Sequence, residues 1–376
     1  MRRIPVVIIG IGSVGRQLIH HIVDTRRLHA KQGLHIGVVG ICDSRSLLLV
    51  NDAMVSGMSD ECLLEICKLK ASAAFLPMLS SKFGNFEVFG ATEIPGKLMA
   101  TAGALGRITG LAFVDCSASS ETVGLLNQVI ELGCCVVLAN KKPLTSDMEV
   151  YDKLVSHPRR IRYESTVGAG LPVITSLNRI LSSGDPINRI VGSLSGTLGY
   201  LMSELEDGKP FSQVVRAAKN LGFTEPDPRD DFGGMDVARK ALILARLLGW
   251  RINMENIKVD SLYPAEMGPN MISTEEFLSK GVLMLDNDFA QRVQLASSNG
   301  KVLRYVCMLE KSSCQVGLLE CPKDSPLGKL KGSANMVEIY SRCYSFPLVI
   351  QGAGAGNDTT AAGVLADILD LQDLFC

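Results

Sequence analysis

Acidic residues crowd into one short stretch of the sequence, residues 222–240, with the sequence GFTEPDPRDDFGGMDVARK. Pro226 and Pro228 restrict the backbone on either side of the residue between them, so we expect a rigid acidic loop. A helix is predicted after the double glycine, and Asp236 and Lys240 lie four residues apart on one face of it. This pattern suits an ammonium-bearing substrate and a lysine that donates a proton. The alternative is a surface turn followed by a helical ion pair.

Histidine cannot assist the acidic stretch locally, because all the histidines of the chain precede it by many residues. Proton transfer in the second half must therefore use Lys, Asp, Glu, Tyr or a thiol. The histidines are His20, His21, His29, His35 and His157.

A glycine-rich turn follows the first apolar segment, residues 5–10, and has the sequence GIGSVG at 10–15. The apolar segment is typical of a strand buried on both faces, and a helix is predicted over 16–28. In this order the glycines allow a tight turn and close approach to a pyrophosphate, which the helix N-terminus faces. A glycine turn without a ligand is the alternative. The predicted dinucleotide contacts are Gly10, Gly12, Ser13, Val14 and Gly15.

The second predicted strand, residues 34–41, ends just before Asp43 and Arg45. An acidic residue here would bind the ribose 2′-hydroxyl of NAD, whereas a nearby arginine would accommodate the 2′-phosphate of NADP. Since both residues are present, the choice of cofactor stays open.

Two further strands, 110–115 and 134–139, precede Ser117 and Lys141. The carboxyl ends of parallel strands collect ligand groups, so both residues are expected at the cofactor. A helix cap is an equally good explanation of the serines. Cys116 has no local base and is expected to be a buried thiol.

Two glycine-punctuated loops occur in the second half, at 164–172 and 352–358. The first can aim several carbonyl groups at one point beside Glu164, as a hard cation requires, although the residues alone favour a plain loop. The second, with Gly354 and Gly356, is expected to return the chain to the first domain beside the nicotinamide.

The length of 376 residues suggests two domains, and 47% hydrophobic residues are ample for two cores. The fold class is α/β: a doubly wound parallel sheet plus an α+β domain for substrate capture and subunit pairing. The first domain is expected to span residues 1–158, completed by 347–376, and the second residues 159–346. A net charge of −1 argues against nucleic acid or an anionic membrane as a partner.

The eleven cysteines are scattered, no leader is recognised at Met1 and no apolar run is long enough to span a membrane. These observations predict reduced thiols and a cytoplasmic location.

Several motifs together resemble the homoserine dehydrogenase family, in the order in which that family carries them over nearly the whole chain. The stretch at 222–240 is the most specific of them. The motifs are GIGSVG at 10–15, ANKKP at 139–143, ESTVGAGLP at 164–172, GSLSGTLGYL at 192–201, GFTEPDPRDDFGGMDVARK at 222–240 and GAGAGND at 352–358.

The resemblance implies a Rossmann-type domain and NAD(P)-linked interconversion of L-aspartate 4-semialdehyde and L-homoserine, usually in a homodimer. It implies that Lys240 is the proton donor and acceptor, and that Lys141 acts next to the nicotinamide. The implied substrate residues are Gly222, Glu225, Asp231 and Asp236. A sodium site is implied at Glu164 with the carbonyl groups of Val167, Ala169 and Leu171, which replaces the plain loop inferred above.

The sequence departs from some family members, because neither an aspartokinase domain before Met1 nor a regulatory domain after Cys376 is recognised. The sequence therefore leaves inhibition by threonine open. Two alternatives remain: a dehydrogenase of another small amino or hydroxy acid, and a dinucleotide-binding regulator without catalysis. The regulator is disfavoured because both Asp236 and Lys240 are intact.

Overall fold

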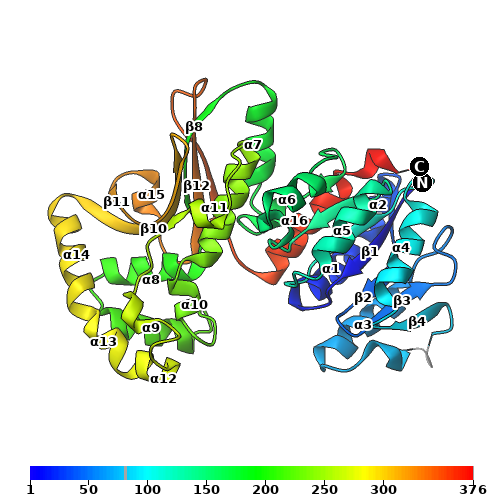
Figure 1. Ribbon diagram of the computed structural model, residues 1–376, viewed down its shortest axis with the longest axis horizontal. Helices are drawn as coiled ribbons and strands as arrows, with labels where there is room; N and C mark the ends of the chain where they lie inside the picture. The colour runs from blue at the N-terminus through cyan, green and yellow to red at the C-terminus, as the bar shows by residue number, and fades with distance from the viewer. Residues whose placement is uncertain (80–82, 376) are drawn as a thin grey trace. The chain divides into compact units, whose positions relative to one another are not determined.

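The computed structural model describes residues 1–79 and 83–375, which form two compact units (Figure 1). The first unit consists of Met1–Gly170 and Gly356–Cys376, and the second of Leu171–Ala355. The boundaries therefore fall later in the chain than the expected positions 158 and 346.

The first unit is built on a seven-stranded sheet in the order β4-β3-β2-β1-β5-β6-β7. Strands β2, β1, β5, β6 and β7 are neighbours that pair in parallel. Strands β3 and β4 extend the sheet beyond β2 as an antiparallel edge. The sequence analysis missed β3. The strands are β1 (Arg2–Ile9), β2 (Leu34–Cys42), β3 (Ser46–Val50), β4 (Phe86–Gly90), β5 (Ala112–Asp115), β6 (Cys135–Leu138) and β7 (Ile161–Arg162).

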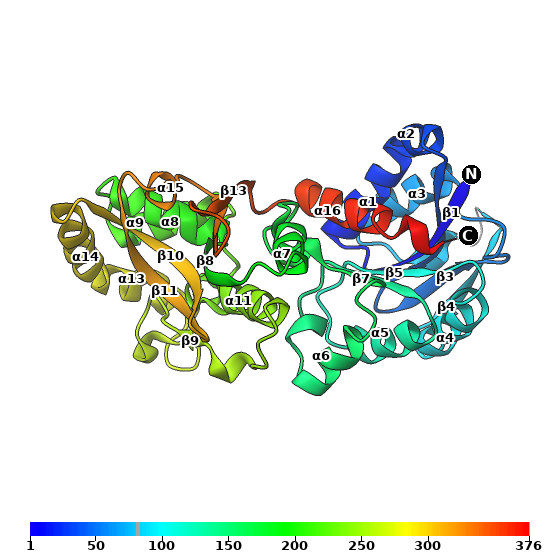
Figure 2. The same cartoon turned by 90° about the horizontal axis from the view of Figure 1, so that it is seen from above.

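Helices cover both faces of this sheet, as expected for a doubly wound fold. In Figure 2, α1, α2, α3 and α16 lie on one side and α4, α5 and α6 on the other. The helix expected over 16–28 is two helices that meet at Thr25, whose hydroxyl donates to the carbonyl group of His21 at 2.6 Å. The helices are α1 (Ser13–Asp24), α2 (Arg26–Lys31), α3 (Asp60–Ala71), α4 (Ile94–Leu105), α5 (Thr122–Glu131), α6 (Met148–Leu154) and α16 (Asn357–Leu369).

The second unit contains a six-stranded sheet in the order β13-β12-β8-β10-β11-β9, which is antiparallel except for the short β9–β11 pair. Strand β13, which leads into the glycine-rich turn, pairs with β12 in this sheet. The expectation that the whole segment after residue 347 joins the first domain is therefore wrong for β13. The strands are β8 (Ile187–Ser193), β9 (Lys258–Val259), β10 (Lys301–Glu310), β11 (Ser313–Pro322), β12 (Ala334–Ser341) and β13 (Leu348–Ala353).

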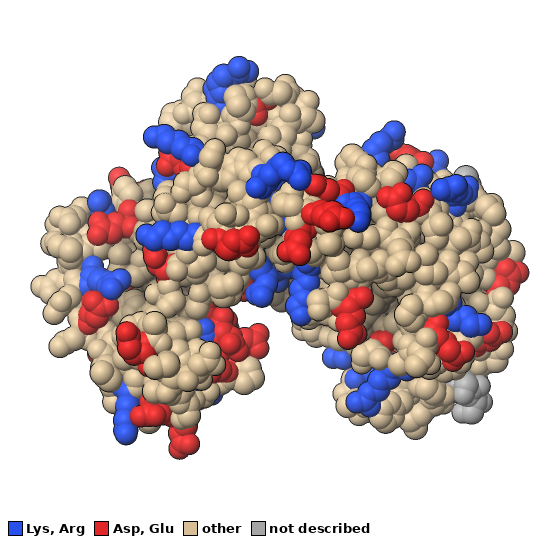
Figure 3. All heavy atoms as spheres, in the orientation of Figure 1, with Lys and Arg blue, Asp and Glu red and all other residues tan. Residues whose placement is uncertain are grey.

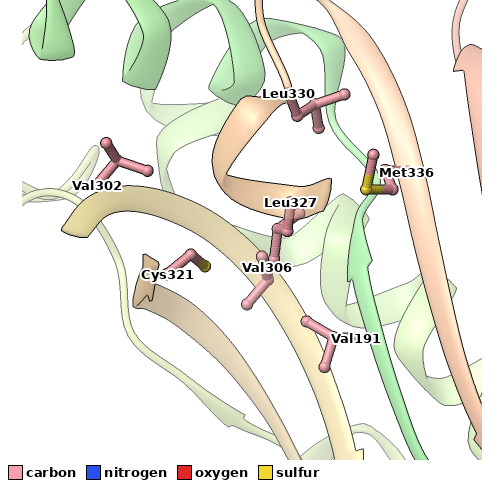
Figure 4. Close-up of a cluster of buried hydrophobic side chains, with 7 residues drawn as sticks. All are labelled: Val191, Val302, Val306, Cys321, Leu327, Leu330 and Met336. Atoms are coloured by element: carbon pink, nitrogen blue, oxygen red, sulfur yellow. The ribbon is translucent and has the colours of Figure 1, made fainter. Parts of the chain in front are cut away.

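One buried hydrophobic cluster of the second unit joins four strands to the short helix α15 (Figure 4). Side chains alternate between the two faces of a strand, so Val302 and Val306 of β10 point into this cluster and Tyr305 and Cys307 to the opposite face. The cluster consists of Val191, Val302, Val306, Cys321, Leu327, Leu330 and Met336. The helices of this unit are α7 (Val173–Ser182), α8 (Gly196–Glu206), α9 (Phe211–Asn220), α10 (Arg229–Phe232), α11 (Met235–Leu247), α12 (Thr274–Glu276), α13 (Val282–Met284), α14 (Asp286–Ser298) and α15 (Pro326–Lys329).

Acidic and basic side chains are interspersed over the face drawn in Figure 3. Among the described residues, none of the helices combines the length and the apolar character needed to cross a lipid bilayer.

Candidate active site

The glycine turn after β1 is packed so tightly that two of its positions exclude any side chain. Gly10 has φ +89°, and a Cβ atom there would lie 2.7 Å from the backbone nitrogen of Ser117. A Cβ on Gly15 would lie 2.1 Å from the carbonyl oxygen of Gly10. A Cβ on Gly12 would instead meet nothing within 4 Å, so open space faces the first turn of α1. Tight packing on one side and open space on the other fit a pyrophosphate at this helix N-terminus.

A cavity of about 420 Å³ opens at the carboxyl ends of β1, β2 and β5. It is lined by four of the predicted cofactor residues, Gly10, Gly12, Asp43 and Ser117. Its position, beside the strands where a doubly wound sheet changes direction, is the usual place for a dinucleotide. The remaining predicted cofactor residues do not line this cavity: Ser13, Val14, Gly15, Arg45, Lys141, Gly354 and Gly356.

Lys70, on the last turn of α3, is a cavity residue that the sequence analysis missed. Its ammonium group lies 3.0 Å from Oδ2 of Asp43, and Oδ1 of Asp43 accepts the backbone N–H of Arg45 at 2.8 Å. Burial alone would raise the pKa of Asp43, but the Arg45 N–H and Lys70 outweigh it and lower that pKa. The Arg45 guanidinium lies 5.1 Å from the centre of the Phe75 ring. The Lys70 ammonium group is therefore a cation in direct contact with the carboxylate that follows β2, and Arg45 lies two residues further along the chain.

The loops after β5 and β6 are joined by a buried carboxylate, Asp115, which is fully enclosed. Asp115 accepts the N–H of Ser117 at 2.9 Å and the side-chain amide of Asn140 at 3.0 Å. Ser119 lines the cavity and its hydroxyl accepts the N–H of Glu121, while the N-terminal end of α5 has no side-chain cap. The serines thus order the loop before α5, and Ser117 also faces the cavity.

The C-terminal glycine loop spans the boundary between the units. Gly354 belongs to the second unit, where a Cβ atom would lie 1.8 Å from the side chain of the buried Asn335. Gly356 belongs to the first unit and precedes α16 with φ +124°. Both positions therefore require glycine for reasons of packing or backbone conformation.

Lys240 is positioned by the start of α11, which follows Gly234 in the left-handed region at φ +73°. A Cβ atom on Gly234 would lie 2.1 Å from the hydroxyl group of Tyr305, so the helix start sits directly on β10. Lys240 is only 8% exposed. Its Nζ donates to the carbonyl oxygen of Leu194 at 2.6 Å and lies 2.8 Å from Oδ2 of Asp236. These two contacts use two of the three hydrogens of the ammonium group.

The acidic loop brings Glu225 and Asp231 together, because Oδ2 of Asp231 accepts the backbone N–H of Glu225 at 2.8 Å. The Glu225 side chain itself is exposed, as is that of Asp236. Burial raises the pKa of Asp231, and the negative charges of Glu225 and Asp236 raise it further. The Glu225 N–H that Asp231 accepts opposes that rise in pKa. The Thr197 hydroxyl donates to the carbonyl oxygen of Phe223 at 2.6 Å. Gly222 lies exposed at the start of this loop with φ +73°.

One carboxylate of the stretch has a structural partner instead. Asp227 binds the guanidinium group of Arg229, with 2.6 Å between Oδ2 and Nη2. Arg229 is 2% exposed and also donates to the carbonyl groups of Met267 and Ile272. The Arg229 hydrogen bond lowers the pKa of Asp227 to about 2. This pair fixes the acidic loop to the segment before α12, in addition to the two prolines.

Replacing Asp227 with asparagine should lower the free energy of unfolding by about 1 kcal/mol at neutral pH, a value reduced for partial exposure of the side chain. Because the folded pKa is depressed, this contribution is complete above the unfolded value near 3.9 and disappears as the pH falls toward 2. Urea titrations of both proteins should show a constant difference from pH 8 to pH 5 that shrinks below pH 4. A difference that persists unchanged into acid would contradict the assignment.

The loop after β7 has the donor chemistry of a hard-cation site but straddles the unit boundary. Glu164 is 7% exposed, Ala169 has φ +57°, and a Cβ atom on the next residue, Gly170, would lie 2.4 Å from the carbonyl oxygen of Thr359 on α16. Val167 is fully buried in the first unit, whereas Leu171 is the first residue of the second. Oxygen-only ligands are the kind that hard cations prefer. No group of three or more His, Cys, Asp or Glu side chains able to hold a metal occurs among residues 1–79 and 83–375.

Comparisons with known proteins agree with these features. The family model described as homoserine dehydrogenase matches residues 172–369. A homoserine dehydrogenase of Saccharomyces cerevisiae is 38% identical over 268 residues, covering 69% of this chain and 74% of that protein. A bifunctional aspartokinase/homoserine dehydrogenase of Haemophilus influenzae is 34% identical over 97% of this chain and 42% of its own length. The chain thus spans about two fifths of such bifunctional relatives.

Solved structures share the fold over almost the full chain. A protein of unknown function from Candida auris has a TM-score of 0.83 at 32% identity, covering 99% of both chains. A hyperthermophilic archaeal homoserine dehydrogenase in complex with NADPH has a TM-score of 0.72 at 24% identity, covering 100% of this chain and 99% of its own. The sequence identity to the yeast enzyme, with most of both chains covered, shows family membership as well as a shared fold. The chain belongs to the homoserine dehydrogenase family.

Proposed function

We propose that this protein is an NAD(P)-dependent homoserine dehydrogenase that reduces L-aspartate 4-semialdehyde to L-homoserine. The observation that carries the proposal is the buried Lys240, held by Asp236 and the Leu194 carbonyl group beside the acidic loop. The family model covers this whole region.

The chain's own residues would move the proton and hold the substrate. The remaining hydrogen on Lys240 Nζ can bond the substrate oxygen and be transferred to it as alkoxide character develops. Glu225, Asp231 and Asp236 would receive the substrate ammonium, and Gly222 would border the pocket. The bound nicotinamide would supply the hydride.

The cofactor residues support a dinucleotide with a 2′-phosphate. Gly10, Gly12, Ser13, Val14 and Gly15 would face the pyrophosphate, and Ser117, Lys141, Gly354 and Gly356 the nicotinamide end. Lys70 and Arg45 beside Asp43 favour NADP, because two cations can neutralise the added phosphate. The archaeal relative with this fold is in complex with NADPH.

Two further features of the family are part of the proposal. Glu164 and the carbonyl groups of Val167, Ala169 and Leu171 would bind sodium, and exchange of sodium for choline should then lower the melting temperature. The protein would form a homodimer through its second unit, which light scattering coupled to gel filtration tests directly.

A single assay tests the function: homoserine-dependent reduction of NAD⁺ and NADP⁺, measured side by side with other small hydroxy amino acids. Reduction with homoserine and preferentially with NADP⁺ is expected. Faster turnover of another hydroxy acid would replace the proposal with a different dehydrogenase activity. Tight NADPH binding without turnover of any of these substrates would favour the alternative, a dinucleotide-binding regulator without catalysis.

The charge of Glu225 is expected to matter for the substrate alone. Glu225→Gln keeps the shape and removes a charge-assisted hydrogen bond of roughly 1.5–3 kcal/mol, so KM for homoserine should rise about tenfold or more. Asp236→Asn should do the same and also lower kcat, since Asp236 contacts Lys240. Steady-state kinetics with Glu255→Gln, an exposed glutamate of the same unit, provide the control. Unchanged homoserine KM in both variants would make the acidic loop structural.

A further inference from the structure

A single buried amide, that of Asn140, connects the two loops that follow β5 and β6. Asn140 is 3% exposed. Its Nδ2 donates to Oδ2 of Asp115 at 3.0 Å and to the carbonyl oxygen of Ser119 at 2.7 Å. Its Oδ1 accepts the backbone N–H of Lys142 at 3.1 Å. One side chain thus bonds to both loops at once.

The two loops carry different parts of the candidate active site. The loop after β5 contributes Ser117, Ser119 and Thr122 to the cofactor cavity, and Asp115 fixes it by accepting from the Ser117 N–H and the Thr122 hydroxyl at 2.9 and 2.7 Å. The loop after β6 carries Lys141. Any movement of Asn140 therefore displaces the cavity wall relative to this lysine.

Lys141 lies between two anchored neighbours. Asn140 precedes it and Lys142, whose N–H is bonded to Asn140, follows it. The carbonyl oxygen of Lys141 accepts the N–H of Leu144 at 3.1 Å and the hydroxyl of Thr145 at 3.1 Å. The backbone of Lys141 is therefore held by the bonds to its own carbonyl group and by the bond between the Asn140 amide and the next residue, Lys142.

The type of residue at position 140 follows from these partners. The site needs a side chain that donates to two oxygens and accepts from one N–H, which an amide does. An ionised aspartate would accept only and would place its charge against Asp115. A leucine would leave the buried Asp115 carboxylate, the Ser119 carbonyl and the Lys142 N–H without these bonds.

We propose that Asn140 is a positioning residue that holds Lys141 and the cofactor-cavity loop at a fixed separation. It acts through these loops and does not itself touch the reacting atoms. The inference rests on the proposed function, in which the cavity binds the dinucleotide and Lys141 lies next to the nicotinamide.

The test compares Asn140→Leu with Asn127→Leu. Asn127 is a partly buried amide of α5 in the same unit, whose Nδ2 donates to the Val150 carbonyl group at 3.3 Å and which does not line the cavity. In Asn140→Leu, the Kd for NADPH from fluorescence titration should rise about tenfold. Its kcat should fall by about 10- to 100-fold, since a misplacement of about 1 Å costs this much. KM for homoserine should stay within about twofold, because the substrate residues belong to the other unit.

A charge-exchange pair keeps the proposal testable if Asn140→Leu does not fold. Asn140→Asp should lower kcat as strongly as the leucine variant, and adding Asp115→Asn restores one amide–carboxylate bond. The double variant should regain at least about threefold in kcat over Asn140→Asp. No recovery in the double variant would overturn the proposal, as would values in Asn140→Leu within twofold of the control. NADPH titration does not depend on turnover. A wild-type protein that binds NADPH but leaves homoserine unchanged would therefore contradict the proposed function without contradicting the role of Asn140 in the cavity.

Discussion

Lys240→Met is expected to lower kcat for homoserine oxidation by about 10²–10⁴-fold, the usual contribution of a general acid–base group. Methionine keeps most of the apolar stem in its buried position, where Lys240 is 8% exposed, and removes only the ammonium group. The Leu194 carbonyl group then loses its 2.6 Å hydrogen bond, and the homoserine hydroxyl loses the group that accepts its proton during oxidation.

The measurements are steady-state kinetics and NADPH titration, with Lys301→Met as the matched control. Lys301 lies on β10 in the same unit and makes an exposed ion pair with Glu320 at 3.1 Å. The control should retain wild-type kcat, and Kd for NADPH should stay within about twofold in both variants. Wild-type kcat in Lys240→Met would show that another group transfers the proton. Lys240→Arg should be inactive as well, because a guanidinium cannot act as a base.

Lys70→Ala should weaken NADPH binding by about 10- to 100-fold and leave NADH binding nearly unchanged. A charge-assisted contact to a phosphate is worth roughly 1.5–3 kcal/mol, and the 2′-phosphate is the one group that distinguishes the two cofactors. Removal of Lys70 also leaves the Asp43 carboxylate, which it contacts at 3.0 Å, without its cationic partner. That carboxylate would then repel the phosphate.

Binding titrations with NADPH and NADH on Lys70→Ala, Arg45→Ala and Lys68→Ala separate the contributions. Lys68 lies on the same helix, and its side chain is 77% exposed beside Glu65, so this variant controls for general effects of charge. Arg45→Ala should also weaken NADPH more than NADH. Equal losses for both cofactors in the Lys70 and Arg45 variants would place the 2′-phosphate elsewhere.

The local parts of the candidate site could be predicted from the sequence. The turn at Gly10–Gly15 follows from steric rules that act within six residues, and the structure shows two of these glycines in contacts that no Cβ permits. The Asp236–Lys240 contact follows from helical spacing alone. The general character of the acidic loop was also predictable from its prolines.

The long-range partners were not predictable, because each depends on how distant segments pack. Lys70 meets Asp43 only once α3 has packed beside β2, and Asn140 meets Asp115 only once β5 and β6 pair. Asp227 was predictable as part of an acidic loop, but its ion pair with an arginine that is buried in the fold was not. An asparagine at the carboxyl end of a predicted parallel strand was a usable signal for Asn140; nothing comparable marks Lys70.

The discontinuous first unit has a consequence for synthesis on the ribosome. Helix α16 packs on α1, where Asp358 accepts from Gln17 at 2.9 Å and pairs with His21 at 2.7 Å. The face of α1 that α16 covers is therefore translated well before α16 itself, which follows residues 171–355 in the chain. The α16-facing surface of the nascent first unit therefore stays uncovered while residues 171–355 emerge and fold. During that interval the growing chain is a natural client for chaperones that shield exposed apolar surface.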